Sequence, residues 1–254
     1  ADLVIWPETS MPFYFQDLTP LRSDVSALAA HADTPLLLGS PAYLLNAASG
    51  EYTLYNRAFL LDGAGHISAW YDKEHLVPFG EYVPLGRWLP IEKLVTAVGN
   101  FAPGEDQPPL RSGAMTLGPL ICYEAIFPAL AQQRVEAGAN LLVNISNDAW
   151  FGDSSAPWQH LSLAAMRCVE QGRWMARCTN TGVTALIDPL GRVTARGVQF
   201  EPLAVSGTVR LVEADTWFHA AHAWIHWGLY AAAALCLLAL LLAPHRDEQR
   251  RIFT

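Results

Sequence analysis

Short apolar runs alternate with amphipathic stretches along most of the chain. Apolar runs bounded by turn-forming residues predict buried β-strands, and apolar residues near a spacing of 3.6 predict helices. The predicted strands are Leu3–Trp6, Leu36–Ser40, Asn56–Leu61, Ile67–Tyr71, Leu117–Cys122, Asn140–Ser146, Val183–Asp188 and Ser206–Leu211. The predicted helices are Asp17–Ala32, Phe127–Ala137 and Trp158–Trp174. This alternation is typical of a layered α/β domain.

Two kinds of connection stand out between these elements. Residues 62–65 (Asp-Gly-Ala-Gly) and 188–191 (Asp-Pro-Leu-Gly) carry turn-forming residues between predicted strands and indicate two β-hairpins, so the sheets are not purely parallel. The stretch Glu74–Pro109 is long, contains six prolines and has little periodicity. Long loops are often functional, so we expect a lid here. Its apolar members include Phe79, Trp88, Leu89 and Phe101.

The C-terminal part is the most apolar region of the chain. Residues Thr216 to His245 include no Asp, Glu, Lys or Arg, and Trp224–Ala243 is almost wholly apolar. About 20 helical residues span a ~30 Å hydrocarbon core. Aromatic residues crowd one end and arginines follow the other, which predicts one transmembrane helix with a cytoplasmic C-terminus. A buried helix of a soluble protein is the alternative, and the flanking residues argue against it.

Composition and charge exclude several classes of protein. The 254 residues are 52% hydrophobic and carry a formal net charge of -8, which argues against a disordered chain and a basic nucleic-acid-binding protein. The four cysteines form no C-x-x-C pair, and His160 has no partner at zinc spacing, so we predict neither a metal nor a cofactor. We interpret His160 as a structural histidine, and Cys168 and Cys178 as small core residues rather than a disulfide.

The pattern of the first six residues also predicts something about the N-terminus. Ala1 to Trp6 form a buried-strand pattern with no initiator methionine, no charged leader and no signal-peptide cleavage pattern. We therefore expect the natural protein to extend upstream of Ala1.

Three polar residues lie where predicted strands end. They are Glu8, Lys73 and Cys122. Taken singly, each has an ordinary explanation: a helix-start cap, a surface cation and a small buried hydrophobe. Cys122 also precedes a predicted helix, where backbone N–H groups could hold an oxyanion.

Taken together, these segments resemble the nitrilase superfamily. The resemblance lies in Trp6-Pro7-Glu8, in Tyr71-Asp72-Lys73 and in Ile121-Cys122-Tyr123-Glu124. Residues 75–84 (HLVPFGEYVP), 146–152 (SNDAWFG), 159–160 (QH) and 179–184 (TNTGVT) resemble more narrowly the apolipoprotein N-acyltransferases of this superfamily. The resemblance extends over residues 1–251.

The resemblance implies an α-β-β-α sandwich and a set of site residues. Cys122 would be the nucleophile, Glu8 the general base and Lys73 the cation beside the developing oxyanion. A thiolate, a carboxylate and an ammonium form a coherent set for acyl transfer. The implied supporting or substrate-binding residues are Glu81, Tyr123 and Glu124.

Ordinary explanations remain open for the supporting residues and their neighbours. Glu81 is otherwise a solvated loop carboxylate, and Tyr123 and Glu124 are otherwise packing and helix-start capping residues. A loop after the strand ending at Ser146 carries three further residues that either line a lipid entrance or close the core. They are Asp148, Trp150 and Phe151.

The resemblance also implies an activity and a location. The implied enzyme moves a fatty acyl chain from a phospholipid, through a cysteine thioester, to the N-terminal amine of a diacylglyceryl-cysteine apolipoprotein. It would lie in a bacterial inner membrane, with residues 1–215 as a periplasmic catalytic domain, 217–243 as the membrane helix and 244–254 as a cytoplasmic tail. No cofactor and no nucleic acid are implied.

Two other functions stay open at this point. An amidase or nitrile hydrolase of the same superfamily would use the same three residues with water as acyl acceptor. A membrane-tethered binding module would keep the fold without catalysis. Discharge of a thioester by an amine or by water separates the first rival, and a Cys122 inert toward thiol reagents would favour the second.

Overall fold

The computed structural model describes residues 1–47, 50–83, 100–105 and 107–242. The chain divides into two compact units, Ala1–Ala214 and Asp215–Thr254. The strands of the first unit are β1 (Val4–Ile5), β2 (Leu36–Leu45), β3 (Tyr52–Leu61), β4 (Ile67–Asp72), β5 (Leu110–Ser112), β6 (Met115–Ile121), β7 (Leu141–Ser146), β8 (Met175–Thr179), β9 (Ala185–Ile187) and β10 (Val193–Arg196). Its helices are α1 (Pro20–Ala32), α2 (Pro128–Glu136) and α3 (Ala156–Gln171), with short 3-10 turns η1 (Cys122–Ile126) and η2 (Asp148–Phe151).

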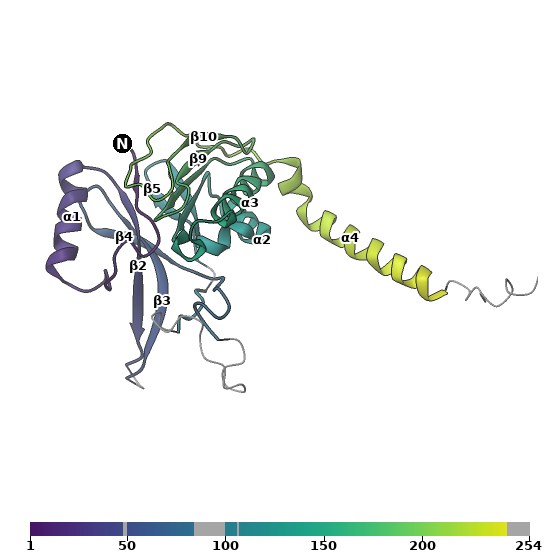
Figure 1. Cartoon of the computed structure of the whole chain (residues 1–254), viewed down its shortest axis with the longest axis horizontal. Helices are drawn as coiled ribbons and strands as arrows, with labels where there is room; N and C mark the ends of the chain where they lie inside the picture. Colours follow the sequence, from purple (N-terminus) through teal and green to yellow (C-terminus); the bar gives the residue numbers. More distant parts are fainter. Residues whose placement is uncertain (48–49, 84–99, 106, 243–254) are drawn as a thin grey trace, which may run out of the picture. The chain divides into compact units, whose positions relative to one another are not determined.

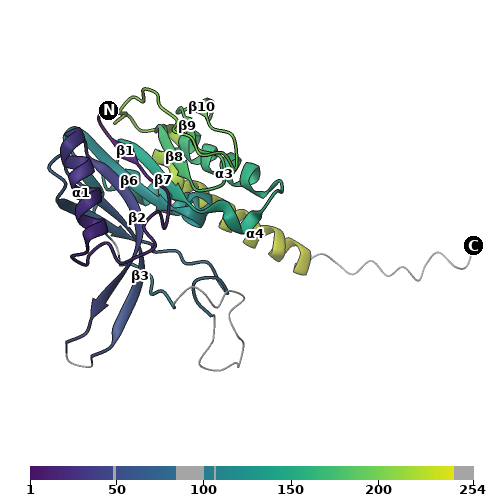
Figure 2. The ribbon, with the colours of Figure 1, turned by 60° about the vertical axis from the view of Figure 1, so that its left-hand side comes forward.

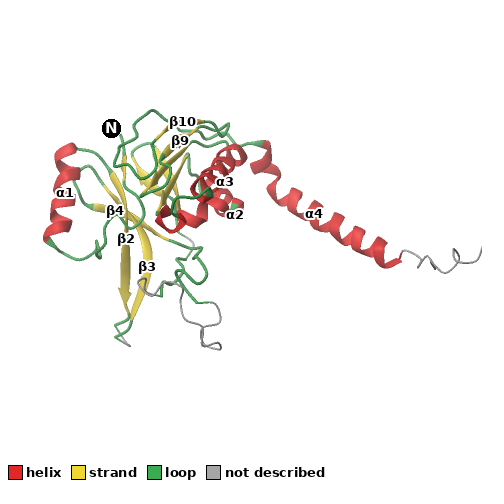
Figure 3. Cartoon of the chain, viewed as in Figure 1, coloured by secondary structure: helices red, strands yellow, loops and turns green. Residues whose placement is uncertain are grey.

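The first unit contains two β-sheets. One has the strand order β1-β2-β3-β4 and the other the order β10-β9-β8-β7-β6-β5. β1 is parallel to β2, and β6, β7 and β8 are parallel to one another, whereas the remaining neighbours are antiparallel. The turns predicted at residues 62–65 and 188–191 are present and connect antiparallel neighbours, β3 with β4 and β9 with β10. Figures 1 and 3 show α1 on the outer side of the first sheet and α2 with α3 beside the second.

The alternation of side chains along the strands divides the apolar core into three clusters, each between two neighbouring layers of the fold. In β2, Leu36 and Leu38 pack in the cluster that includes Ala29 of α1, whereas Leu37 lies in the cluster shared by the two sheets. In β7, Leu142 packs toward α2 and α3, whereas Val143 faces the first sheet. Because successive strand residues point to opposite faces, each strand serves two layers. The predicted α-β-β-α order of layers is confirmed (Figure 2).

Local signals set the ends of the helices. The Thr19 side chain accepts a hydrogen bond from the Arg22 N–H, and Pro20 occupies the first turn, so α1 begins three residues after the predicted Asp17. α3 ends where Gly172 adopts a left-handed conformation, before the predicted Trp174.

One predicted strand is wrong and three observed strands were not predicted. The segment Ser206–Leu211 forms no strand, although Val209 packs against the core between the sheets. Within the described residues, the backbone of 206–212 makes one hydrogen bond, from the Val212 N–H to the Asn140 carbonyl, which is too few for a ladder. The strands missing from the prediction are β5, β8 and β10.

The described part of the second unit, residues 215–242, contains the long helix α4 (Trp217–Leu242). Thr216 starts it, since its hydroxyl oxygen accepts a hydrogen bond from the His219 N–H. The helix has 26 residues and contains no Asp, Glu, Lys or Arg, and among the described residues it alone is long and apolar enough to cross a membrane. Length and composition thus make α4 a candidate membrane span.

Candidate active site

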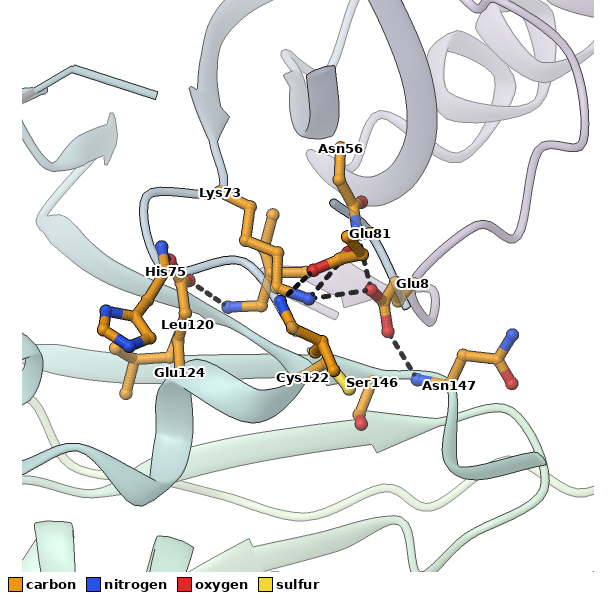
Figure 4. Close-up of polar contacts among 12 residues, drawn as sticks. Glu8, Asn56, Lys73, His75, Glu81, Leu120, Cys122, Glu124, Ser146 and Asn147 are labelled. Carbon is orange, nitrogen blue, oxygen red and sulfur yellow. Dashed lines mark hydrogen bonds and ion pairs between the residues drawn. The ribbon is translucent and has the colours of Figure 1, made fainter. Parts of the chain in front are cut away.

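The three polar residues that follow predicted strands come together at strand ends. β1 and β4 run in the same direction within their sheet, and Glu8 and Lys73 follow their C-terminal ends. Cys122 follows the C-terminal end of β6, next to the ends of the parallel strands β7 and β8. The two sheets therefore place a carboxylate, an ammonium and a thiol at one locus, as Figure 4 shows.

Glu8 is buried and held by two hydrogen bonds. Its Oε1 accepts from the Asn56 amide at 2.7 Å, and its Oε2 accepts from the Asn147 backbone N–H at 2.8 Å. These contacts come from opposite sheets, because Asn56 lies on β3 and Asn147 follows β7. The carboxylate thus has a fixed orientation between the sheets.

Close packing of the backbone brings Glu8 to this place. A Cβ atom on Gly39 of β2 would lie 2.7 Å from the Glu8 Cα. Only a residue without a side chain permits this approach.

Lys73 is almost fully buried between two carboxylates. Its Nζ lies 2.9 Å from Glu81 Oε1 and 3.6 Å from Glu8 Oε1. The Asn56 amide donates to both carboxylates, at 2.7 Å to Glu8 and 2.9 Å to Glu81. Burial by itself lowers the pKa of Lys73, but neighbouring negative charges, first that of Glu8 and then that of Glu81, outweigh it and raise that pKa. The side chain is therefore a permanent cation with three N–H donors.

Glu81 is thus a buried partner of Lys73 rather than a solvated loop carboxylate. Its Oε2 accepts from the Val77 N–H at 2.8 Å, and its backbone carbonyl accepts from the Phe101 N–H at 3.1 Å. The first contact orients the carboxylate, and the second joins the Glu81 backbone to the chain at Phe101.

Cys122 is buried and has an unusual backbone. Its φ of 52° lies in the left-handed region, which costs a non-glycine residue roughly 1–2 kcal/mol. Burial and the Glu8 charge raise the pKa of the thiol to about 12, although the Lys73 charge and a hydrogen bond with Ser146 oppose that rise. The resting sulfur is therefore a thiol, and a base beside it is needed to form the thiolate.

The opposed charges beside Cys122 predict opposite effects of two substitutions. Glu8→Gln removes a charge that raises the pKa of the thiol, so alkylation by iodoacetamide should shift to lower pH. Lys73→Met removes a charge that lowers it, so alkylation should shift to higher pH. Each shift is expected to be about one pH unit or more. The measurement is the alkylation rate of each variant between about pH 6 and pH 10, followed by intact mass, since the thiolate is the reacting form. Shifts in the same direction would contradict this electrostatic account.

Glu124 ties the nucleophile turn to the chain after Lys73. Its Oε2 accepts from the Ile121 N–H at 2.6 Å, which is a helix-start cap. Its Oε1 accepts from the N–H groups of Glu74 and His75, at 2.8 and 3.0 Å, and from the Tyr71 hydroxyl at 2.9 Å. Burial raises the pKa of Glu124, while these donors and the Lys73 charge limit that rise. One carboxylate thereby fixes the ends of β4 and β6 together.

Tyr123 packs in an aromatic cluster at the surface. Its ring lies edge-on to Phe127 with centroids 4.9 Å apart, and the His75 ring lies 4.0 Å from Phe127. These ring contacts hold the Tyr123 side chain in place, and its supporting role in the site stays a prediction.

A second polar network, absent from the sequence-based site, lies beside Cys122. It consists of Asn144, Ser146, Asp148, His160 and Arg177, all buried. Asp148 accepts from the Ser146 hydroxyl at 2.6 Å and from Arg177 Nη2 at 2.8 Å. It is 1% exposed and so lies in the core, in contrast to its neighbours Trp150 and Phe151, which are 62% and 39% exposed. An Asp and an Arg separated by 29 residues give no local signal in the sequence.

The remaining sequence predictions have mixed outcomes. All four cysteines are free. Within the described ranges, no group of three or more His, Cys, Asp or Glu side chains is placed to hold a metal ion. Trp88 and Leu89 of the predicted lid lie outside the described residues, as do the arginines at positions 246, 250 and 251. Phe79 is partly exposed and Phe101 is partly buried.

Comparison with known proteins identifies relatives of this chain. Residues 1–217 match the carbon-nitrogen hydrolase family. The chain is 43% identical over 237 residues to the apolipoprotein N-acyltransferase of Geobacter metallireducens, and 40% identical over 241 residues to that of Pseudomonas syringae pv. tomato. These matches cover 92% and 94% of this chain but 45% and 46% of the relatives. The chain thus spans about half the length of the curated relatives it matches.

Solved structures with the same fold are more distant in sequence. An amidase from Nesterenkonia sp. has a TM-score of 0.61 at 23% identity, covering 89% of this chain and 83% of the amidase. A carbon-nitrogen hydrolase from Helicobacter pylori has a TM-score of 0.56 at 19% identity, covering 78% of this chain and 73% of that protein. These two likenesses concern the fold alone.

Proposed function

The chain belongs to the carbon-nitrogen hydrolase family, and we propose that Cys122, Glu8 and Lys73 are its catalytic residues. The observation that carries this proposal is the position of the buried thiol beside a carboxylate and an ammonium that lie 3.6 Å apart, all at the ends of three strands. Both charges act on the sulfur, since Glu8 raises the pKa of the thiol and Lys73 lowers it. In this arrangement, one neighbour can take the proton and the other can stabilise negative charge.

We further propose that the reaction is acyl transfer from a phospholipid to the N-terminal amine of a diacylglyceryl-cysteine apolipoprotein. Two observations support this choice over other reactions of the family. The relatives at 43% and 40% identity are named apolipoprotein N-acyltransferases, and α4 is long and apolar enough to cross a membrane. Because both substrates are lipids, an anchored catalytic unit would meet them at the bilayer surface.

In the first half-reaction, Glu8 accepts the Cys122 proton and the thiolate attacks the ester carbonyl of the phospholipid. The resulting tetrahedral oxyanion develops beside the Lys73 ammonium. Its collapse breaks the ester bond, and the leaving oxygen takes the proton from Glu8 to give a lysophospholipid. Cys122 then carries the acyl chain as a thioester.

In the second half-reaction, the apolipoprotein amine attacks the thioester and transfers its proton to Glu8. Collapse of the new tetrahedral species forms an amide and expels the Cys122 thiolate, which recovers the proton from Glu8. Division into two steps replaces one difficult transfer by two easier ones.

Glu81 and Glu124 serve as supporting residues in this scheme. Glu81 fixes the Lys73 ammonium by its 2.9 Å contact, and Glu124 joins the chain after Lys73 to the turn that carries Cys122. Neither role requires contact with substrate.

The proposed location is a bacterial inner membrane, with residues 1–215 in the periplasm, 217–243 in the bilayer and 244–254 in the cytoplasm. The aromatic and arginine flanks of the apolar segment support this orientation. A green fluorescent protein fused to the C-terminus should then fluoresce in cells, whereas an alkaline phosphatase fused there should stay inactive. The reverse pattern would contradict the orientation.

Intact mass spectrometry tests the acyl-transfer proposal. Phospholipid alone should add one acyl mass to the chain, through a bond that hydroxylamine cleaves. A synthetic diacylglyceryl-cysteine peptide should then discharge the adduct and appear as the acylated peptide. Discharge by water at the same rate with and without peptide would favour the amidase alternative, and an adduct on Cys168 or Cys178 would contradict the assignment of the nucleophile.

A further inference from the structure

The buried network beside Cys122 makes direct contact with the nucleophile's own backbone. His160 Nε2 lies 3.0 Å from the Cys122 carbonyl oxygen, and Asn144 Nδ2 lies 3.5 Å from the same atom. A carbonyl oxygen can only accept a hydrogen bond, so Nε2 carries a proton in this contact. His160 is 5% exposed, so this contact lies in the interior.

The other ring nitrogen of His160 faces both a donor and an acceptor. Nδ1 lies 3.1 Å from Asp148 Oδ1 and 3.1 Å from Arg177 Nη2. A protonated Nδ1 would donate to Asp148, and an unprotonated Nδ1 would accept from Arg177. Either state of the ring leaves the Nε2 proton directed at the Cys122 carbonyl.

The members of the network hold one another in place. Asp148 and Arg177 form an ion pair at 2.8 Å, and both side chains are fully buried. Arg177 also donates to the Asn144 side chain and to the Val183 carbonyl. Hydrogen bonding by His160 and the charge of Arg177 lower the pKa of Asp148 despite burial, so its carboxylate stays charged. His160, which lies on α3, is thus held in place by Asp148 of η2 and Arg177 of β8.

A hydrogen bond to the Cys122 carbonyl also orients the N–H of the following residue, Tyr123. The peptide unit is planar and trans, so the Cys122 C=O and the Tyr123 N–H point in opposite directions. His160 binds the carbonyl end, which turns the Tyr123 N–H away from His160. The left-handed backbone of Cys122 needs such restraint, because surrounding contacts must maintain a strained conformation.

We propose that His160, held by Asp148 and Arg177, is a positioning residue that aligns the Cys122–Tyr123 peptide so that its N–H stabilises the oxyanion of acyl transfer. The inference rests on the proposed role of Cys122 as nucleophile. It assigns to His160 an effect on the formation of the tetrahedral oxyanion and not on the thiol itself. Two reactions of the same sulfur separate these effects.

The first reaction is alkylation by iodoacetamide, in which the thiolate displaces iodide and no oxyanion forms. The second is acylation by p-nitrophenyl butyrate, in which the thiolate adds to the carbonyl, an oxyanion forms, and its collapse releases p-nitrophenolate and leaves the thioester. Both are measured at one pH on the full chain in detergent micelles. The acylation rate comes from the p-nitrophenolate burst and the alkylation rate from intact mass.

His160→Phe keeps a ring but removes the donor, and should lower the acylation rate by about 10²-fold, with alkylation changed less than about threefold. His160→Gln places an amide N–H at the reach of Nε2 and should recover most of the acylation rate. Equal losses in both reactions would indicate a merely structural role and overturn the proposal. Unchanged acylation in His160→Phe, or no recovery in His160→Gln, would overturn it as well.

Gln171→Met is a matched control on the same helix. Gln171 is fully buried on α3 and donates to Gln132 Oε1 at 3.0 Å, so its loss disturbs a buried polar contact elsewhere. Its thermal unfolding should fall as in His160→Phe, while the ratio of acylation to alkylation should stay native. A drop in this ratio for Gln171→Met would overturn the specific role of His160.

The non-lipid ester keeps this test apart from the lipid proposal. A native chain that accepts the butyryl group but no phospholipid acyl group would contradict the lipid substrate alone, and the His160 comparison would still decide its own case. A native chain inert to both esters would overturn both proposals.

Discussion

Replacement of Cys122 with alanine should abolish the acyl adduct and lower acyl transfer by about 10⁴-fold or more, as expected for loss of a covalent nucleophile. Cys122→Ser should also lose most of the transfer. Its hydroxyl is a far weaker acid than a thiol, and the same burial and Glu8 charge that raise the pKa of the thiol act against its ionisation. The measurement is intact mass after exposure to phospholipid, together with the rate of peptide acylation.

Cys178→Ala is the matched control for this result. Cys178 is a free, mostly buried thiol on β8 whose Sγ lies 3.3 Å from the Ile5 carbonyl oxygen, and it has no role in the proposed chemistry. Its substitution should leave the adduct and the transfer rate within about threefold of native. An adduct that persists in Cys122→Ala and disappears in Cys178→Ala would reverse the assignment.

Substitution of Lys73 by methionine should reduce acylation of Cys122 by about 10³-fold. The ammonium lies at the locus where negative charge develops, and methionine fills a similar volume without charge. The substitution also leaves Glu8 and Glu81 buried without their shared cation, so the free energy of unfolding should fall by about 3–5 kcal/mol. Both quantities are measured, by p-nitrophenyl ester burst kinetics and by urea unfolding.

A double variant separates the chemical from the structural effect. When Lys73→Met is combined with Glu81→Gln, only Glu8 remains as a buried carboxylate without a cation beside it. Part of the lost stability should therefore return. Acylation should stay as low as in Lys73→Met, because the cation is still absent. Recovery of acylation together with stability would show that Lys73 acts only through the fold.

The strand ends explain why so much of the site was predictable. Glu8, Lys73 and Cys122 each follow an apolar run, and such a run ends where the chain leaves the buried sheet. The positions of these residues in the sequence therefore already place them at the edges of strands. The prediction failed where a strand carries a charge in its interior, as in β8 with Arg177, which is buried against Asp148. A local pattern cannot indicate that a distant residue will neutralise such a charge.

The sequence by itself determined the layered α/β class, the two hairpins, the candidate span α4 and the residue types of the candidate site. These features depend on local periodicity, turn chemistry and family motifs, and each of these signals lies within a short stretch of the sequence. Only the tertiary structure decided that Asn56 bridges Glu8 and Glu81, and that His160 binds the Cys122 carbonyl. These contacts join residues that are 25 to 48 positions apart. They form because two sheets and α3 pack together. The polar groups buried by this packing are stable only when they are hydrogen-bonded.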